Sequence, residues 1–376
     1  MVNNPLRKLE EFGQSVWLDF IQRQMTLSGE LKGLIEDDGL SGLTSNPTIF
    51  AKAIGGSQDY DAAVRALAQS GKNSLAIYES VAIEDLQRAA DLLRPTYERQ
   101  NGKDGFVSME VSPYLVHDTQ GTLAEARRFW RALERPNVLI KVPGTDAGLA
   151  AIQQLIAEGI NVNVTLLFGL PRYRQVVEAY LAGLEDRAAH GRPVDRVASV
   201  ASFFLSRIDT LIDPMLEKLV AAGGENAGLA YDLRGQAAIA SAKLAYQIYQ
   251  ENFQGARWQR LATQGSRTQR VLWASTSTKN PAYSDVKYVE PLIGPDTINT
   301  MPMETIQAYR DHGRPALTLT RDMEAAHRAM AQLQAVGIDI DQITKQLEAE
   351  GAAKFSASFD ELLEAVEEKR KATVSA

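Results

Sequence analysis

The chain of 376 residues contains no cysteine. Disulfide bonds, cysteine-ligated zinc, iron–sulfur clusters and thiol catalysis are therefore excluded. Only four histidines occur, at His117, His190, His312 and His327, and their spacing is too wide for a short metal-binding motif. We therefore expect no bound metal and no cofactor.

Features typical of membrane and nucleic-acid-binding proteins are also missing. No run of about 18 apolar residues occurs, and the first residues, MVNNPLRKLEEFG, contain no apolar segment of the signal-peptide type. The 40 Lys and Arg residues are outnumbered by 47 Asp and Glu residues, which gives a net charge of −7. General nucleic-acid binders usually carry an excess of basic residues. We expect a cytoplasmic protein that binds neither membranes nor nucleic acids.

The composition is that of a globular protein, with 45% hydrophobic and 23% charged residues. The length fits two domains of about 150 residues. It fits equally well one barrel of about 250 residues with additions.

Short apolar segments rich in β-branched residues alternate with segments of helical period. Strands are predicted at 15–21, 40–46, 106–112, 138–143, 161–168, 196–205, 270–276 and 296–301. Amphipathic helices are predicted at 59–69, 123–133, 149–158 and 173–183. This alternation predicts parallel β/α units, and eight of them favour a closed (β/α)8 TIM barrel of the α/β class. The alternative is an open doubly wound sheet.

We predict a single domain, 1–376, with the barrel at about 15–315 and a C-terminal helical extension at about 316–376. A mostly helical interval, 207–269, also exceeds a minimal barrel. In the extension, Gly337 and Gly351 are expected to separate helices at 322–336, 340–350 and 358–371. This extension could cover the barrel base, reach the site through an aromatic such as Phe355, or form a subunit contact. A homo-oligomer is therefore left open.

Three ionisable residues stand inside strongly apolar strands: Asp19 in VWLDF, Glu110 in VSMEV and Lys141 in VLIKVP. Charged side chains are seldom fully buried without partners, because desolvation is costly. A structural ion network is one interpretation. Three such residues on different strands of one barrel favour a shared pocket, since barrel sites form at the carboxyl ends of strands.

The alternation of side chains along a strand predicts which residues point into the barrel. Lys141 shares a face with Leu139, opposite the apolar face expected to contact helices. The other residues predicted to face inward are Asn161, Asn163, Thr165, Ser202, Phe204, Trp273 and Ser275. The interior is therefore expected to be polar.

A buried lysine among carboxylates has a distinctive chemistry. Desolvation disfavours its charged form, so its pKa is expected to fall and free amine to be present near neutral pH. A free amine can form a Schiff base with a carbonyl substrate. Glu110 and Asp19 are of the type needed for the proton transfers.

Two further segments carry polar groups at strand ends. In GLTSNPTIF, 42–50, Thr44 and Asn46 would present hydrogen-bonding groups to a hydroxylated ligand, although Asn-Pro also marks ordinary turns. After the seventh strand, Ser275 and Lys279 resemble an anion cradle, and Arg207 could add a bidentate contact.

The two segments GLTSNPTIF and VLIKVPGTDAGLAAIQQL, 138–155, resemble the two signature motifs of transaldolases. Further matches follow in the family's order: Asp19 in the first strand, VSMEVSP, NVTLLF, SFFLSR and WAST. The resemblance covers about 15–310, and the length and tail are similar to those of the longer bacterial branch.

This resemblance implies a cofactor-free Schiff-base mechanism of the non-oxidative pentose phosphate pathway. Its expected substrates are sugar phosphates: dihydroxyacetone moves from sedoheptulose 7-phosphate or fructose 6-phosphate to an aldehyde phosphate. The matched positions imply Lys141 as the Schiff-base lysine, Glu110 and Thr165 as holders of a catalytic water, and Asp19 as the acid/base at the donor's C4 hydroxyl. They also imply that Asn46 and Ser202 hold the dihydroxyacetone hydroxyls and that Arg207 and Ser275 form part of the phosphate site; Thr44 and Phe204 complete the predicted substrate-binding residues.

One departure concerns the phosphate site. Many transaldolases have a second arginine just after the strand-seven serine, whereas this chain reads Thr276-Ser-Thr-Lys279. We expect Lys279 to take its place, as a point charge without the guanidinium fork.

Two alternatives remain. Related fructose-6-phosphate aldolases, which release free dihydroxyacetone, are shorter and have Gln and Tyr where this chain has Glu110 and Phe204. A non-catalytic sugar-phosphate sensor on a barrel would need the pocket but not the amine.

Overall fold

The eight apolar segments form eight parallel strands in the computed structural model, which describes residues 4–374. These strands are β1 (Gln14–Leu18), β2 (Leu40–Leu43), β3 (Phe106–Glu110), β4 (Val138–Pro143), β5 (Val162–Leu167), β6 (Ser199–Phe204), β7 (Arg270–Ala274) and β8 (Thr297–Met301). They close into a barrel in chain order, because β1 pairs with β8 as well as with β2. The predicted (β/α)8 barrel is confirmed, and the open doubly wound sheet is wrong.

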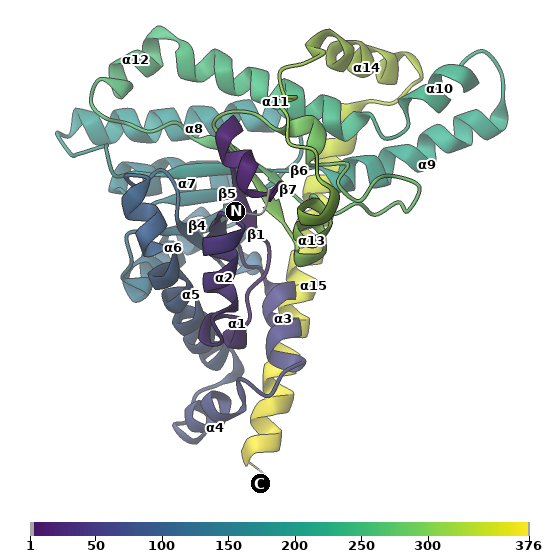
Figure 1. Ribbon diagram of the computed structural model, residues 1–376. Coiled ribbons are helices and arrows are strands. Elements are labelled where there is room, and N and C mark those ends of the chain that lie inside the picture. The colour runs from purple at the N-terminus through teal and green to yellow at the C-terminus, as the bar shows by residue number, and fades with distance from the viewer. Residues whose placement is uncertain (1–3, 375–376) are drawn as a thin grey trace.

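Helices follow the strands and surround the barrel (Figure 1). The first seven α-helices are α1 (Arg23–Leu27), α2 (Glu30–Asp37), α3 (Pro47–Gly55), α4 (Asp61–Gln69), α5 (Ser74–Arg99), α6 (Thr119–Leu133) and α7 (Asp146–Glu158). The next eight are α8 (Leu170–Ala189), α9 (Ser206–Ala222), α10 (Ala227–Leu233), α11 (Ala237–Gln254), α12 (Ala256–Ala262), α13 (Met303–His312), α14 (Met323–Ala335) and α15 (Ile340–Val374). Three short 3-10 helices are η1 (Arg7–Phe12), η2 (Pro113–Leu115) and η3 (Glu290–Leu292). The four predicted amphipathic helices are confirmed as parts of α4, α6, α7 and α8.

Four strands, β1, β2, β3 and β7, end two or three residues before the predicted position, because the chain leaves the sheet close to polar residues, whereas β4 and β8 end where predicted. At the end of β2, Asn46 becomes the N-cap of α3, where its side chain accepts a hydrogen bond of 3.0 Å from the Ile49 amide. Pro47 follows as the first helical residue, a position that suits its fixed φ and missing N–H. The Asn-Pro pair therefore begins a helix rather than a simple turn.

Large side chains fill the amino-terminal half of the barrel interior. Trp17 is fully buried, lies 6.4 Å from the Phe106 ring and donates a hydrogen bond of 2.8 Å to Asp104. The backbone of Gly42 passes so close that a Cβ there would lie 2.3 Å from the indole. This packing fills the barrel interior below the carboxyl ends of the strands.

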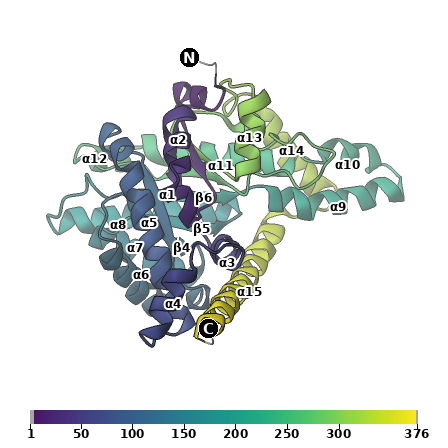
Figure 2. The ribbon, with the colours of Figure 1, turned by 60° about the horizontal axis from the view of Figure 1, so that its bottom comes forward.

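The helix α15 lies beside α3 in both ribbon views (Figures 1 and 2). The predicted break at Gly351 is wrong, because this residue lies in the interior of a single helix. A Cβ at Gly351 would lie 3.0 Å from Leu166 and 3.5 Å from Phe168, so the glycine lets α15 pack closely over the end of β5. Gly337 does separate α14 from α15, with a φ of +84°.

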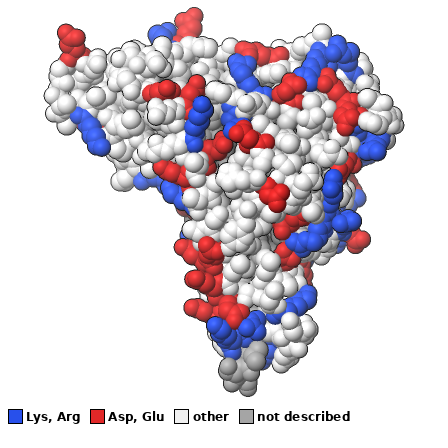
Figure 3. Space-filling model, turned by 180° about the vertical axis from the view of Figure 1, so that it is seen from behind, with Lys and Arg blue, Asp and Glu red and all other residues white. Residues whose placement is uncertain are grey.

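Acidic and basic side chains are interspersed on the face seen from behind (Figure 3). Ion pairs join many charges across the described residues; Arg257, for example, pairs with both Glu178 and Glu185. No helix within residues 4–374 combines the length and the hydropathy needed to cross a lipid bilayer.

Candidate active site

A cavity of about 330 Å³ lies at the carboxyl ends of the barrel strands. Its wall contains nine of the eleven residues predicted for the site: Asp19, Thr44, Asn46, Lys141, Ser202, Phe204, Arg207, Ser275 and Lys279. The other two, Glu110 and Thr165, are buried on β3 and β5, the strands on either side of β4. The fold thus gathers the predicted residues from the seven strands β1 to β7 and the loops that follow them.

Lys141 stands near the end of β4, opposite Glu110 of β3 in the strand register. Its Nζ atom lies 3.5 Å from a Glu110 carboxylate oxygen and donates a hydrogen bond of 3.3 Å to the Ser45 carbonyl. Lys141 is only 4% exposed and Glu110 only 7%. The two charged groups therefore face each other in a largely desolvated environment.

Burial raises the pKa of Glu110 to about 7, although the nearby Lys141 charge opposes this rise. Neither carboxylate oxygen makes a hydrogen bond within the described residues, and the buried Thr165 hydroxyl also has no partner there. Buried polar groups normally have a partner, either in the protein or in ordered water. Glu110 and Thr165 are therefore available to bind a small polar molecule.

Asp19 immediately follows β1 and accepts a hydrogen bond of 2.7 Å from the Thr44 hydroxyl. Burial raises the pKa of Asp19, an effect that the Lys141 charge and the Thr44 hydrogen bond partly offset. The second carboxylate of the cavity is thus held by the GLTSNPTIF segment. Its carboxyl group is of the kind that exchanges protons with a bound hydroxyl.

A chain of buried polar side chains supports the opposite wall. The Ser202 hydroxyl donates a hydrogen bond of 2.7 Å to Asn163, whose amide donates one of 3.0 Å to Ser108. Asn163 and Ser108 were not among the predicted site residues, although strand alternation already placed Asn163 inside the barrel. This chain fixes Ser202 at the cavity surface.

The outer end of the cavity carries Arg207, Ser275 and Lys279. Arg207 is half-buried in the first turn of α9, lies 5.5 Å from the Phe204 ring and has no carboxylate partner within the described residues. Burial lowers its pKa, yet a guanidinium remains charged at neutral pH. Lys279 is exposed and contacts the Ser277 hydroxyl. These cations are free to bind an anion.

The predicted inward face of β7 is wrong. Leu272 and Ala274 line the cavity, whereas Trp273 donates a hydrogen bond of 3.1 Å to the Leu292 carbonyl of η3. Ser275 still reaches the cavity, because its φ of +56° ends the regular alternation of the strand. Its hydroxyl shares a hydrogen bond of 2.8 Å with Ser206.

Two helices contribute residues that the sequence did not assign to the site: Lys52 from α3, and Lys354 and Ser358 from α15. Phe355 of α15 also lines the cavity, with its ring 5.8 Å from the Lys141 Nζ atom. The described lining therefore has five cationic side chains against two carboxylates, Asp19 and Glu304. This imbalance favours an anionic ligand.

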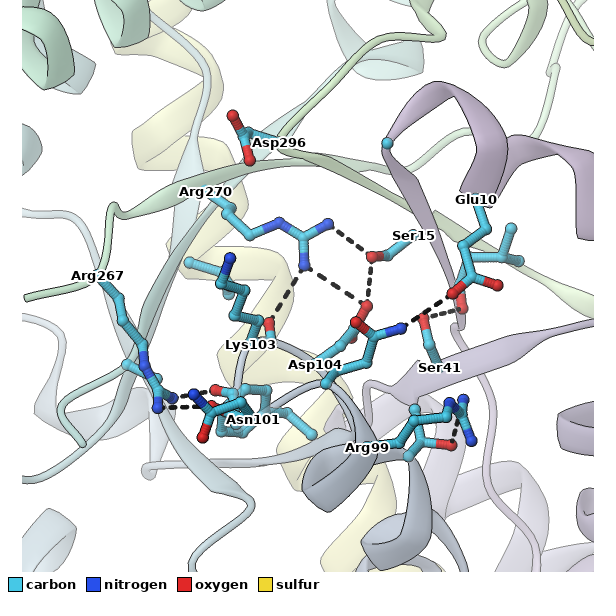
Figure 4. A pocket seen from close by; sticks show the side chains of 18 of the residues that line it. Glu10, Ser15, Ser41, Arg99, Asn101, Lys103, Asp104, Arg267, Arg270 and Asp296 are labelled. Atoms are coloured by element: carbon cyan, nitrogen blue, oxygen red, sulfur yellow. Dashed lines mark hydrogen bonds and ion pairs between the residues drawn. The ribbon is translucent and has the colours of Figure 1, made fainter. Parts of the chain in front are cut away.

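A larger cavity, about 1330 Å³, lies at the opposite end of the barrel, where the strands begin (Figure 4). Its arginines bind neighbouring segments: Arg270 donates to Ser15 at 2.6 Å and pairs with Asp104 at 3.5 Å, and Arg267 donates to the Asn101 carbonyl at 2.7 Å. No residue predicted for the site lines this cavity. Residues at this end of a barrel usually serve stability, so the smaller cavity is the better candidate.

Within residues 4–374, no group of three or more His, Asp or Glu side chains is arranged to hold a metal ion.

The fold and the cavity define an enzyme built on a (β/α)8 barrel, with an amine and carboxylates at the carboxyl ends of the strands. The family model described as transaldolase/fructose-6-phosphate aldolase matches residues 16–366. Transaldolase 2 of Nostoc sp. strain PCC 7120 is 47% identical over 376 residues, covering 99% of both chains. The transaldolase of Trichodesmium erythraeum is 47% identical over 375 residues, again covering 99% of both chains. The transaldolase of Saccharopolyspora erythraea is 47% identical over 371 residues, covering 97% of this chain and 98% of its own. The chain belongs to the transaldolase/fructose-6-phosphate aldolase family.

Proposed function

We propose that this protein is a transaldolase that moves a dihydroxyacetone unit from sedoheptulose 7-phosphate to glyceraldehyde 3-phosphate, giving erythrose 4-phosphate and fructose 6-phosphate. The observation that carries this proposal is the buried Lys141 amine, 3.5 Å from Glu110, in a cavity whose outer end holds Arg207 and Lys279, which have no carboxylate partner among residues 4–374. The relatives named transaldolase support the same conclusion.

In the proposed first stage, the Lys141 amine adds to the C2 carbonyl of the ketose phosphate. The resulting carbinolamine loses water and becomes an iminium ion. We assign the proton transfers to Glu110 through a water molecule shared with Thr165, because both side chains are buried and lack hydrogen-bond partners within the described residues.

In the second stage, Asp19 takes the proton of the C4 hydroxyl, and the C3–C4 bond breaks. The bonding electrons move to the iminium, which becomes an enamine, and the aldehyde phosphate leaves. Attack of the enamine on the carbonyl of the acceptor reverses these steps, and hydrolysis releases the product. The raised pKa of Asp19 favours an acid/base role, because it brings the carboxyl group nearer to neutral pH.

The remaining cavity residues would bind the rest of the sugar. Thr44 holds Asp19, Asn46 and Ser202 face the dihydroxyacetone hydroxyls, and Phe204 lies beside Arg207. Arg207, Ser275 and Lys279 would bind the phosphate, with Lys279 in place of the arginine that many relatives have. No cofactor is part of this mechanism.

We also propose that the barrel and the C-terminal extension form a single functional domain, because Phe355 of the extension lines the same cavity as the barrel residues. We further propose that the protein is located in the cytoplasm. A chain without cysteine gains no disulfide stabilisation in an oxidising compartment.

Borohydride trapping with fructose 6-phosphate tests the mechanism directly. We expect a stable adduct on Lys141, located by peptide mass mapping and lost in Lys141→Ala. Wild-type protein that gives neither an adduct nor turnover would favour the sugar-phosphate sensor. Substantial release of free dihydroxyacetone without an acceptor would favour the aldolase.

A further inference from the structure

The proposed phosphate site is divided between two segments of the chain. Arg207 belongs to the first turn of α9, whereas Ser275 and Lys279 belong to the loop 275–289 that joins β7 to η3. A phosphate group can contact both segments only if this loop is held at a fixed position against α9.

Two tyrosine–aspartate hydrogen bonds tie the loop to this helix. The Tyr283 hydroxyl donates to Asp213 at 2.7 Å, and the Tyr288 hydroxyl donates to Asp209 at 2.8 Å. We call these four residues the Tyr–Asp clamp. Both aspartates lie on α9, on the two turns that follow Arg207.

The aspartates of the clamp are buried and fully engaged. Asp209 is 2% exposed and Asp213 is 5% exposed. The second oxygen of Asp209 accepts a hydrogen bond of 2.8 Å from the Ala238 amide, and that of Asp213 accepts one of 2.8 Å from the Gly235 amide. A buried carboxylate whose two oxygens both accept hydrogen bonds keeps a defined geometry, because the loss of either hydrogen bond would leave an unpaired buried group. The clamp therefore joins α9, the loop and the segment between α10 and α11.

Further bonds carry this restraint from Tyr283 to Lys279. The Thr278 hydroxyl donates to the Ser284 carbonyl at 2.8 Å, and the Tyr283 amide donates to the Asn280 carbonyl at 3.1 Å. The first bond closes a short turn that contains Lys279, and the second closes the residues that follow it. Lys279 itself is exposed and has no carboxylate partner within the described residues, so the turn determines where its ammonium group can reach.

We infer that the Tyr–Asp clamp positions Lys279 opposite Arg207, so that both cations contact the phosphate of the bound sugar. This inference rests on the proposed function, because it assigns Lys279 to the phosphate site. Tyr283 and Asp213 are positioning residues that act through Lys279 and do not line the cavity.

The first test is Tyr283→Phe, which removes one hydroxyl from a half-buried side chain and keeps the ring. We expect the KM for erythrose 4-phosphate to rise about two- to fivefold, as for the loss of one hydrogen bond, with little change in kcat. The KM for unphosphorylated D-glyceraldehyde should not change, because this acceptor makes no phosphate contact. The matched control is Tyr231→Phe, since Tyr231 is 57% exposed and its hydroxyl makes no hydrogen bond within residues 4–374.

The second test is a double-mutant cycle with Lys279→Ala. If Tyr283 acts through Lys279, Tyr283→Phe should have no further effect on this KM in the Lys279→Ala background. Equal effects of Tyr283→Phe in both backgrounds would overturn the inference. So would a loss of thermal stability in Tyr283→Phe with an unchanged KM for erythrose 4-phosphate, because the clamp would then serve the fold alone.

These outcomes are distinct from a failure of the proposed function. Wild-type protein without transfer activity would remove the transaldolase proposal itself. A KM for erythrose 4-phosphate that is unchanged in Lys279→Ala would remove Lys279 from the phosphate site and this inference with it. A raised KM in Lys279→Ala with no change in Tyr283→Phe would contradict only the role of the clamp.

Discussion

The Lys141 Nζ atom and a Glu110 carboxylate oxygen lie 3.5 Å apart, at paired positions of β4 and β3. Both side chains are buried, and the Glu110 oxygens make no hydrogen bond within the described residues. Apart from their ion pair and the Lys141 hydrogen bond to the Ser45 carbonyl, the two groups keep unused hydrogen-bonding capacity within the described residues, which is typical of groups kept available for chemistry.

Replacing Glu110 should change how stability depends on pH. Burial raises the folded-state pKa of Glu110 to about 7 from its ordinary value of 4.5, so the folded protein binds this proton more tightly than the unfolded chain. The contribution of this proton to the free energy of unfolding is complete below pH 4.5, and it is lost as the pH rises through about 7. The free energy of unfolding of wild type minus that of Glu110→Gln should therefore fall by up to about 3 kcal/mol from pH 4.5 to about pH 8. Urea unfolding at both pH values measures this difference, and a constant difference would contradict the prediction.

The two cations of the proposed phosphate site should contribute unequally. Arg207 is half-buried and can donate two parallel hydrogen bonds, whereas Lys279 is exposed. We expect Arg207→Ala to raise the KM for erythrose 4-phosphate by about a hundredfold and Lys279→Ala by about fivefold. Steady-state kinetics with D-glyceraldehyde as the alternative acceptor provides the control. Equal increases in KM for both acceptors would show that these residues do not bind the phosphate.

Phe204 should limit the release of free dihydroxyacetone. Its ring lines the cavity, lies 5.2 Å from Phe168 and has no group that can donate a proton. Phe204→Tyr adds a hydroxyl that could protonate the enamine, so free dihydroxyacetone should form from fructose 6-phosphate at least about tenfold faster. A coupled assay without acceptor measures this rate. Unchanged release from a normally folded variant would argue against a role for this position in choosing transfer over lysis.

Gly42 should be essential for packing of the barrel interior. A Cβ there would lie 2.3 Å from the Trp17 indole, which is fully buried. We expect Gly42→Ala to lower the free energy of unfolding by about 3 kcal/mol or more. The control is Gly228→Ala in α10, where the new Cβ meets no atom within 4 Å. The stability of this variant should stay the same or rise slightly. Chemical denaturation of both variants makes the comparison; equal stabilities would refute the packing argument.

The sequence by itself determined the barrel, and it predicted nine of the residues that line the candidate cavity. Eight apolar segments separated by helical patterns predicted eight parallel strands. The spacing of apolar residues along the chain differs between strands and helices, so it indicates which element forms. The alternation of side chains along β4 placed Lys141 inside the barrel, because the period of a strand also determines which side chains share a face. The motifs around Asn46 and Lys141 carried the resemblance to the family.

Tertiary structure decided where distant segments meet. Phe355 and Lys354 reach the cavity only because α15 passes over the end of β5, where Gly351 allows close packing. Ser275 faces the cavity through a backbone φ of +56°, which the alternation rule does not foresee. The hydrogen bond between Tyr283 and Asp213 joins residues 70 positions apart. Local patterns report the period of an element and its buried face. The docking of one element on another depends on the packing of the whole chain.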